Sequence, residues 1–225
     1  MLTLHHLEYS QSFRILWLLE AIGATYELIT YERDPKNLLA PPAYKDLSPL
    51  GTAPVITEGD LVLAETNAII DYLLDRHPND ELRPAADAPH RTRHLFWYHT
   101  AQGSLTPLMM IETFFTFIRQ RVPLFLKPLV VLVLNRAVDG FLRPRLELIL
   151  QKAEQDLQEA AWFGGPSLSA ADIVMSYAME SAKVRGHLTE AYPSCRDWLE
   201  RIQAEASFQA ARAKVGNAQM VVVST

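Results

Sequence analysis

The first third of the chain alternates between short apolar runs, which are typical of strands, and the wider apolar spacing of helices. Leu2–Leu7 predicts a strand, and Ser10–Ala21 predicts a well-buried helix. Tyr26–Tyr31 returns to β-branched and aromatic residues and predicts a second strand. The prolines of Glu32–Asp46 then favour a loop with a short helix near Tyr44.

The next segment predicts a hairpin followed by a helix. Ala53-Pro54-Val55 follows a Pro-Gly turn, and Leu61–Ala64 is a second short apolar run. The helical pattern then extends from Thr66 to about Arg76. With the β-α-β order before it, this hairpin implies a mixed sheet covered by helices.

Pro54 makes the hairpin informative. Proline cannot donate to a ladder, so its strand should either lie at a sheet edge or hold the proline in a special conformation. The following helix begins at Glu65 and Thr66, which bring a carboxylate and a hydroxyl to its N-terminus. An unpaired strand edge beside such a terminus can hold an extended peptide with a free carboxylate. The pattern therefore favours a small-peptide site.

The composition changes at His77–Arg91, which carries three prolines and scattered charge, as an interdomain linker does. We expect one domain over residues 1–80, a linker over 81–90 and an all-helical domain over 91–225. In that second domain, Ser169 and Asp172 form a capping-box-like helix start. Its helices are predicted at Thr92–Gln120, Gly140–Ala160, Ile173–Met179 and Trp198–Ala211.

Val122–Leu134 is the most apolar stretch of the chain. It is too short to span a bilayer, and Lys127-Pro128 interrupts it. We expect a buried helix or a lid over an apolar pocket, and no stable membrane insertion.

Composition and charge narrow the class of protein. The 225 residues carry 21 basic and 26 acidic side chains, a net charge of −5, so no basic footprint for nucleic acid exists. The single cysteine, Cys195, excludes an internal disulfide and suits a reducing compartment. The N-terminus has neither a basic region nor a long apolar run, so we expect no signal peptide and a cytoplasmic protein.

The histidines do not suggest a metal site. His5 and His6 are adjacent on a predicted strand, so their side chains point to opposite faces. His94 and His99 are five residues apart, which is not a same-face helical spacing. We expect no metal.

Five segments, in this order and spacing, resemble the soluble glutathione transferase family, and the match covers nearly the whole chain. The resemblance implies a thioredoxin-like α/β domain with a mixed four-stranded sheet, followed by an all-α domain. The first segment is most similar to bacterial and fungal branches that use a serine. The segments are SQSFRILWLLE (Ser10–Glu20), RDPKNLLAPPAYKDLSPLGTAPVI (Arg33–Ile56), ETNAIIDYL (Glu65–Leu73), LSAADIVMSY (Leu168–Tyr177) and YPSCRDWLERIQ (Tyr192–Gln203).

This resemblance implies that glutathione lies along Ala53-Pro54-Val55, with Pro54 cis and the Val55 backbone paired to the cysteinyl unit. Glu65 and Thr66 would hold the γ-glutamyl end. Thr52 stands where the family often places Lys, Arg or Gln for the glycyl carboxylate. Either Lys36, Lys45 or another group takes that role, or glutathione binds more weakly.

The chemistry then requires a thiolate, and each pKa unit by which the thiol is lowered needs about 1.4 kcal/mol of anion stabilisation. A hydroxyl donor at the start of the first helix can supply it. Ser10 matches the family's serine in position, and Ser12 and Tyr9 are competing donors. Ser10 could instead serve only as a helix N-cap.

An apolar electrophile is the expected second substrate, and the first long helix of the second domain offers its wall. Each wall residue could equally belong to the core. The expected function is conjugation of the glutathione thiolate to that electrophile, with peroxide reduction as a further activity. A non-catalytic glutathione-binding or protein-interaction module is the alternative, and the family implies a homodimer. The main wall candidates are Tyr98, Gln102, Met109 and Phe114, with Leu105, Met110 and Phe117 beside them.

Overall fold

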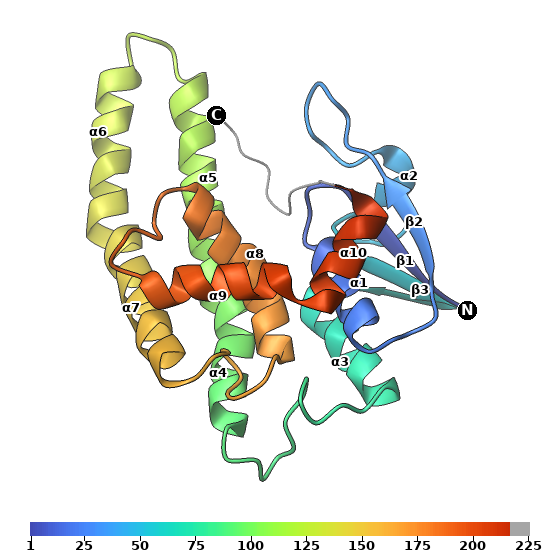
Figure 1. The fold of residues 1–225 in the computed structure, drawn as a ribbon. Helices are drawn as coiled ribbons and strands as arrows, with labels where there is room; N and C mark the ends of the chain where they lie inside the picture. Colours follow the sequence, from blue (N-terminus) through green and yellow to red (C-terminus); the bar gives the residue numbers. More distant parts are fainter. Residues whose placement is uncertain (217–225) are drawn as a thin grey trace.

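The computed structural model describes residues 1–216, in which a small sheet domain packs against a helical domain (Figure 1). The sheet has the order β2-β1-β3-β4, with β1 and β2 parallel and the β1–β3 and β3–β4 pairs antiparallel. This mixed four-stranded sheet confirms the predicted fold class. The elements of the first domain are β1 (Leu2–Leu7), α1 (Ser12–Ala21), β2 (Glu27–Tyr31), α2 (Pro42–Lys45), β3 (Val55–Glu58), β4 (Leu61–Ala64) and α3 (Thr66–Arg76).

Strand β3 is internal, so the expectation of a sheet edge at the proline was wrong. Val55 is in register with His5 of β1 on one side and Ala64 of β4 on the other. Pro54 lies one residue before the strand, where no ladder donor is lost. The Ala53–Pro54 peptide bond is cis, which is the other alternative and the one that the family resemblance implied.

Helix α1 begins at Ser12 rather than Ser10, with Gln11 as its N-cap residue. Ser10 lies in the turn before the helix, where its hydroxyl oxygen accepts from the Ser12 backbone amide at 3.2 Å. The apolar spacing predicted the helix correctly, but a serine side chain that bonds a nearby amide holds the chain outside the helix.

The second domain is helical throughout the described residues (Figure 1). Helix α8 is almost entirely buried, and α10 returns to pack Phe208 against Trp17 and Phe13 of α1. Two short π-helical turns, η1 and η2, interrupt the longer helices. The elements are α4 (Arg91–Thr100), η1 (Ala101–Leu105), α5 (Thr106–Arg121), α6 (Lys127–Ala137), η2 (Val138–Leu142), α7 (Arg143–Glu159), α8 (Ala170–Val184), α9 (Pro193–Ala204) and α10 (Ala206–Val215).

The single helix predicted at Trp198–Ala211 is in fact two helices. Glu205 takes an extended conformation (φ −61°, ψ 134°) that ends α9 and begins α10. No glycine or proline marks this break in the sequence, so the apolar spacing alone could not show it. Residues 217–225 of the predicted second domain lie outside the described residues.

The predicted capping box at the start of α8 is present. The Ser169 hydroxyl accepts from the Ala171 amide at 3.2 Å, and the Asp172 carboxylate accepts from the Ser169 amide at 3.0 Å. Asp172 also accepts from the Phe163 amide and the Trp198 indole. The box therefore anchors α8 to α9 and to the segment before it.

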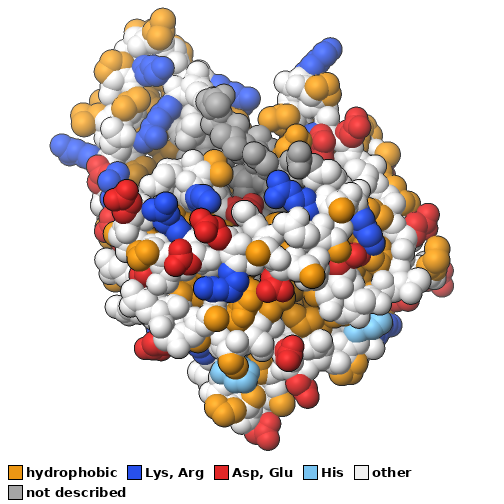
Figure 2. Space-filling model, viewed as in Figure 1, with side chains coloured by type: hydrophobic (Ala, Val, Ile, Leu, Met, Phe, Trp, Pro, Cys, Tyr) orange, Lys and Arg blue, Asp and Glu red, His pale blue; other side chains and the backbone are white. Residues whose placement is uncertain are grey.

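Val122–Leu134 is mostly exposed, so the prediction of a buried helix was wrong. Leu124 and Phe125 are 84% and 82% exposed in the turn before α6, and Leu134 is the buried residue of that helix. Apolar and basic side chains lie together over the ends of α5 and α6 (Figure 2). Nor does the stretch line the apolar cavity described below. Within residues 1–216, no helix has the length and apolar character needed to cross a membrane.

Candidate functional site

The turn between β1 and α1 holds the three hydroxyl candidates. Ser10 is 6% exposed, and its hydroxyl donates to the Leu7 carbonyl at 2.7 Å. The Ser12 hydroxyl is fully buried and lies 2.8 Å from that of Ser10. Tyr9 is 37% exposed and has a left-handed backbone (φ +50°). Of the two serines, Ser10 is therefore the one closer to the protein surface.

The same turn is fixed to the start of α3. Arg14 is fully buried and donates to the Thr66 hydroxyl at 3.2 Å, to the Gln11 side chain and to the Val174 carbonyl. Burial lowers the Arg14 pKa to about 10, which leaves the guanidinium charged at neutral pH. Oxygens of hydroxyl, amide and carbonyl groups surround it. The Thr66 hydroxyl therefore faces the domain interface.

The predicted peptide segment lies beside this turn. Val55, Leu7 and Tyr44 form one buried apolar cluster, against which Ala53 packs. Val55 has a neighbouring strand on each side, whereas the backbone N–H and C=O of Ala53 make no hydrogen bond within residues 1–216. Thr52 is exposed.

The start of α3 has no side-chain cap. Glu65 precedes the helix with an exposed side chain and a left-handed backbone (φ +75°), and makes no side-chain cap. The first amides of a helix without a side-chain cap are a favourable place for a carboxylate. Ser10, Ala53 and Glu65 come from three separate segments, which are connected by the packing of Ala53 against the Leu7 cluster and by the bond from Arg14 to Thr66.

An apolar cavity of about 450 Å³ opens between the first domain and helices α5 and α8. Arg33 connects two of the lining segments, because its guanidinium donates to the carbonyls of Tyr9 and Leu38. Both of these residues have left-handed backbones. Burial lowers the Arg33 pKa. The cavity is lined by Tyr9, Arg33, Asn37, Leu38, Leu39, Thr106, Met109, Met110, Thr113, Phe114, Phe117, Tyr177, Ala178, Ser181 and Arg185.

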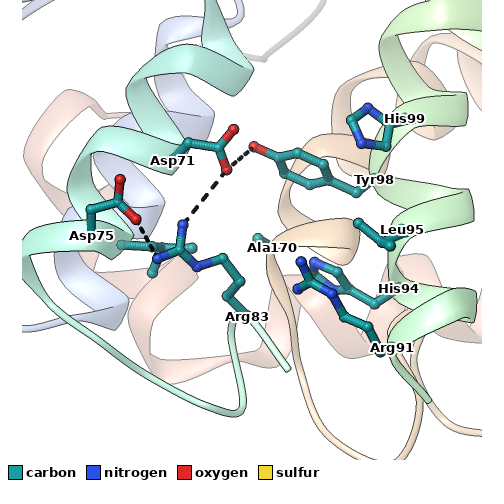
Figure 3. A pocket seen from close by; sticks show the side chains of 10 residues that line it. Asp71, Asp75, Arg83, Arg91, His94, Leu95, Tyr98, His99 and Ala170 are labelled. Carbon is teal, nitrogen blue, oxygen red and sulfur yellow. Dashed lines mark hydrogen bonds and ion pairs between the residues drawn. The ribbon is translucent and has the colours of Figure 1, made fainter. Parts of the chain in front are cut away.

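The four wall candidates lie in three different places. Met109 and Phe114 line the apolar cavity. Gln102 instead donates to the Gln11 side chain at 3.1 Å, across the domain interface. Tyr98 lines a separate polar cavity of about 400 Å³ between α3 and α4, where its hydroxyl donates to Asp71 (Figure 3). Helical spacing alone cannot separate the cavity face of α4 and α5 from their other faces.

Most of the cavity residues that sequence reasoning missed lie outside the long helix predicted at Thr92–Gln120, although Thr106 and Thr113 lie on α5. Arg33 and Leu38 follow β2 in the first domain, and Tyr177 and Arg185 lie on or just after α8. Arg33–Leu38 falls within one of the segments that resembled the family, and that was its only available signal. The packing of α8 against the cavity depends on tertiary structure, so no local sequence pattern indicates it.

Neither a metal cluster nor a reactive cysteine is evident. Among the residues that the structure describes, no three His, Cys, Asp or Glu side chains gather as metal ligands would. Cys195 is fully buried, and burial raises the pKa of its thiol. A thiol in that state is a poor nucleophile.

Comparisons with known proteins show what this chain is similar to. Residues 1–75 match the family model described as glutathione S-transferase, N-terminal domain. The chain is 27% identical to glutathione S-transferase 3 of Schizosaccharomyces pombe over 225 residues, covering 100% of this chain and 92% of that protein. It is 30% identical to glutathione S-transferase 1 of Saccharomyces cerevisiae, covering 93% of each chain.

A solved glutathione S-transferase from Actinobacillus pleuropneumoniae has the same fold, with a TM-score of 0.78. It is 29% identical, over 98% of this chain and 94% of that one. The site geometry, the sequence relatives and the fold lead to one conclusion, that the chain belongs to the glutathione S-transferase family.

Proposed function

We propose that this protein conjugates the thiolate of glutathione to apolar electrophilic substrates, with Ser10 as the catalytic hydroxyl. The observation that carries this proposal is the position of Ser10 in the turn before α1. Its hydroxyl bonds the carbonyl of Leu7, which shares an apolar cluster with Ala53, and the adjacent residue Tyr9 lines the apolar cavity. Such an arrangement lets one sulfur atom meet both a hydroxyl donor and an apolar substrate.

The reaction needs a thiolate and a nearby carbon electrophile. The glutathione thiol loses its proton to solvent, and its sulfur then forms a bond to the electrophilic carbon as a leaving group departs with the electron pair. A donated Ser10 hydroxyl stabilises the sulfur anion before this step. Holding both substrates in one site supplies the rest of the rate acceleration, because the two molecules no longer have to meet by diffusion.

We assign the peptide contacts to groups with open hydrogen-bonding capacity. The Ala53 backbone groups would pair with the cysteinyl unit in place of those of Val55, which lie inside the sheet. Glu65 would receive the γ-glutamyl ammonium, and the first amides of α3 would receive its carboxylate. The Thr66 hydroxyl would act indirectly, because Arg14 already holds it.

The second substrate is an apolar molecule that fits the cavity beside Tyr9, Met109 and Phe114. Peroxide reduction would use the same thiolate and is included in the proposal. We further propose a cytoplasmic homodimer in which each sheet domain faces the partner's helical domain. The role in the cell would be detoxification.

The test is the Ser10→Ala variant together with glutathione calorimetry. We expect the bound-thiol pKa to rise by one to two and conjugation to fall by about 10- to 100-fold, with little change in glutathione affinity. Unchanged activity would remove Ser10 from the catalytic role. Binding of glutathione without turnover on several electrophiles would favour the non-catalytic alternative, and no binding at millimolar glutathione would contradict both.

A further inference from the structure

A buried histidine is connected to Ser10 by two consecutive hydrogen bonds. His6 of β1 places its Nδ1 2.9 Å from the Ser12 hydroxyl oxygen, which in turn lies 2.8 Å from the Ser10 hydroxyl oxygen. His6 and Ser12 are 2% and 0% exposed. Neither side chain has a role in the function proposed above.

The direction of these bonds depends on which ring nitrogen of His6 carries the proton. Nε2 is buried and has no hydrogen-bond partner within the described part of the chain. An unpaired buried N–H is rarer in proteins than an unpaired buried acceptor. Burial also lowers the His6 pKa to about 4, so the ring is neutral at physiological pH. The proton is therefore expected on Nδ1, which donates to Ser12.

The lone pairs of the Ser12 and Ser10 hydroxyl oxygens then determine the direction of the remaining hydrogen bonds. The Ser12 oxygen accepts from His6 and from the Leu7 amide at 3.1 Å, which uses both of its lone pairs. Its own proton must be donated, and the shortest contact left to it is Ser10 at 2.8 Å. Ser10 then accepts from both the hydroxyl and the backbone amide of Ser12. Both lone pairs of Ser10 are occupied, so this hydroxyl is left to act only as a donor.

We propose that His6 and Ser12 are positioning residues that hold Ser10 as a hydrogen-bond donor toward the glutathione sulfur. In the free protein that proton is donated to the Leu7 carbonyl at 2.7 Å, and in the complex it turns to the thiolate. The proposal rests on the proposed function of Ser10. It adds a directional hydrogen-bond relay from the sheet to the catalytic hydroxyl.

The first test measures the tautomer directly in the unmodified protein. Nitrogen-15 NMR of labelled histidine distinguishes a protonated Nδ1 from a protonated Nε2. We expect His6 to carry its proton on Nδ1 at neutral pH, with or without glutathione. A protonated Nε2 would overturn the proposed direction, and this result does not depend on any variant folding.

The second test uses variants and titration of the bound thiol. We expect Ser12→Ala and His6→Leu to raise the pKa of the bound thiol by about one. At pH values below the thiol pKa, kcat/KM should fall about tenfold, while the KM for glutathione stays within twofold. His6→Asn keeps an amide donor near the Nδ1 position and should recover most of the loss. A merely structural role would not give this split between KM and thiol pKa.

His5→Leu is the matched control. His5 is also buried on β1, but it bonds Tyr31 and Thr57 rather than Ser12, so its loss should leave the thiol pKa unchanged. If Ser10→Ala raises the thiol pKa while folded Ser12→Ala and His6→Leu do not, the relay is wrong and the proposed function stands. If Ser10→Ala also has no effect, the assignment of Ser10 itself fails.

Discussion

The guanidinium of Arg14 donates to the hydroxyl of Thr66 over 3.2 Å, and so joins the start of α1 to the start of α3. Its second donor reaches the Val174 carbonyl of α8 at 2.7 Å. One buried side chain therefore fixes three helices that belong to two domains. The glutathione site proposed here is assembled around this contact.

Replacement of this residue, Arg14→Met, should destabilise the protein by about 3 kcal/mol, because the buried Val174 carbonyl and the Thr66 hydroxyl lose a charged donor. Urea unfolding would measure the loss. Arg76→Met is the control, since Arg76 is exposed and contacts Tyr72 and Glu58 at the surface. It should change the unfolding free energy by less than about 1 kcal/mol. Equal losses in the two variants would contradict the assigned role.

The left-handed backbone of Glu65 predicts a conflict between stability and binding. A non-glycine residue at φ +75° carries strain of about 1 kcal/mol, which glycine would relieve. Glu65→Gly should therefore raise the thermal midpoint or leave it unchanged, while it weakens glutathione binding through loss of the carboxylate. Glu65→Gln keeps the strain and removes the charge, so it should weaken binding without raising the midpoint. Calorimetry and thermal unfolding of both variants would separate the two effects.

The positions of the strands could be predicted from the sequence, whereas the burial and the ends of some helices could not. The apolar runs placed all four strands near their observed positions, because strand and helix periods differ and Pro and Gly punctuate them. The same logic failed at Val122–Leu134, which is apolar on all sides, so its pattern could not tell which faces would be buried. It also failed at Glu205, where a helix ends on backbone dihedral angles alone.

The candidate site shows a similar division. The hydroxyl at Ser10 and the segment at Ala53 could be proposed from the sequence because each lies in a segment that resembles the family. Arg33 and Tyr177 line the cavity through contacts between segments far apart in the chain. Tyr98 and Met109 could not be separated because adjoining turns of α4 and α5 face different cavities. Such distinctions depend on how the helices pack.

The exposed threonine at position 52 predicts a gain of affinity on substitution. Thr52→Lys would place an ammonium group near the expected glycyl carboxylate, where an exposed ion pair contributes up to about 1 kcal/mol. We expect the Kd for glutathione to fall about threefold at low salt, and the gain to shrink at high salt. Thr52→Gln, which adds length without charge, should show a smaller and salt-independent change. An unchanged Kd in the lysine variant would place the glycyl carboxylate elsewhere.

Two buried histidines predict that stability falls as pH drops below neutral. Burial lowers the pKa of His6 and of His94 to about 4, against 6.5 in the unfolded chain. Between these values the unfolded state binds more protons than the folded state, so the free energy of unfolding rises with pH across the window. Each histidine contributes about 3 kcal/mol that is fully present above pH 6.5 and lost as pH falls toward 4.

Urea unfolding from pH 7 down to pH 4 would measure this dependence in the unmodified protein and in His94→Gln. The variant should lose stability less steeply, because one of the two buried rings no longer takes up a proton on unfolding. His77→Gln is the control, since His77 is exposed at the end of α3 and should leave the slope unchanged. If the His94 variant keeps the full slope, the burial of this ring does not govern the acid sensitivity of the fold.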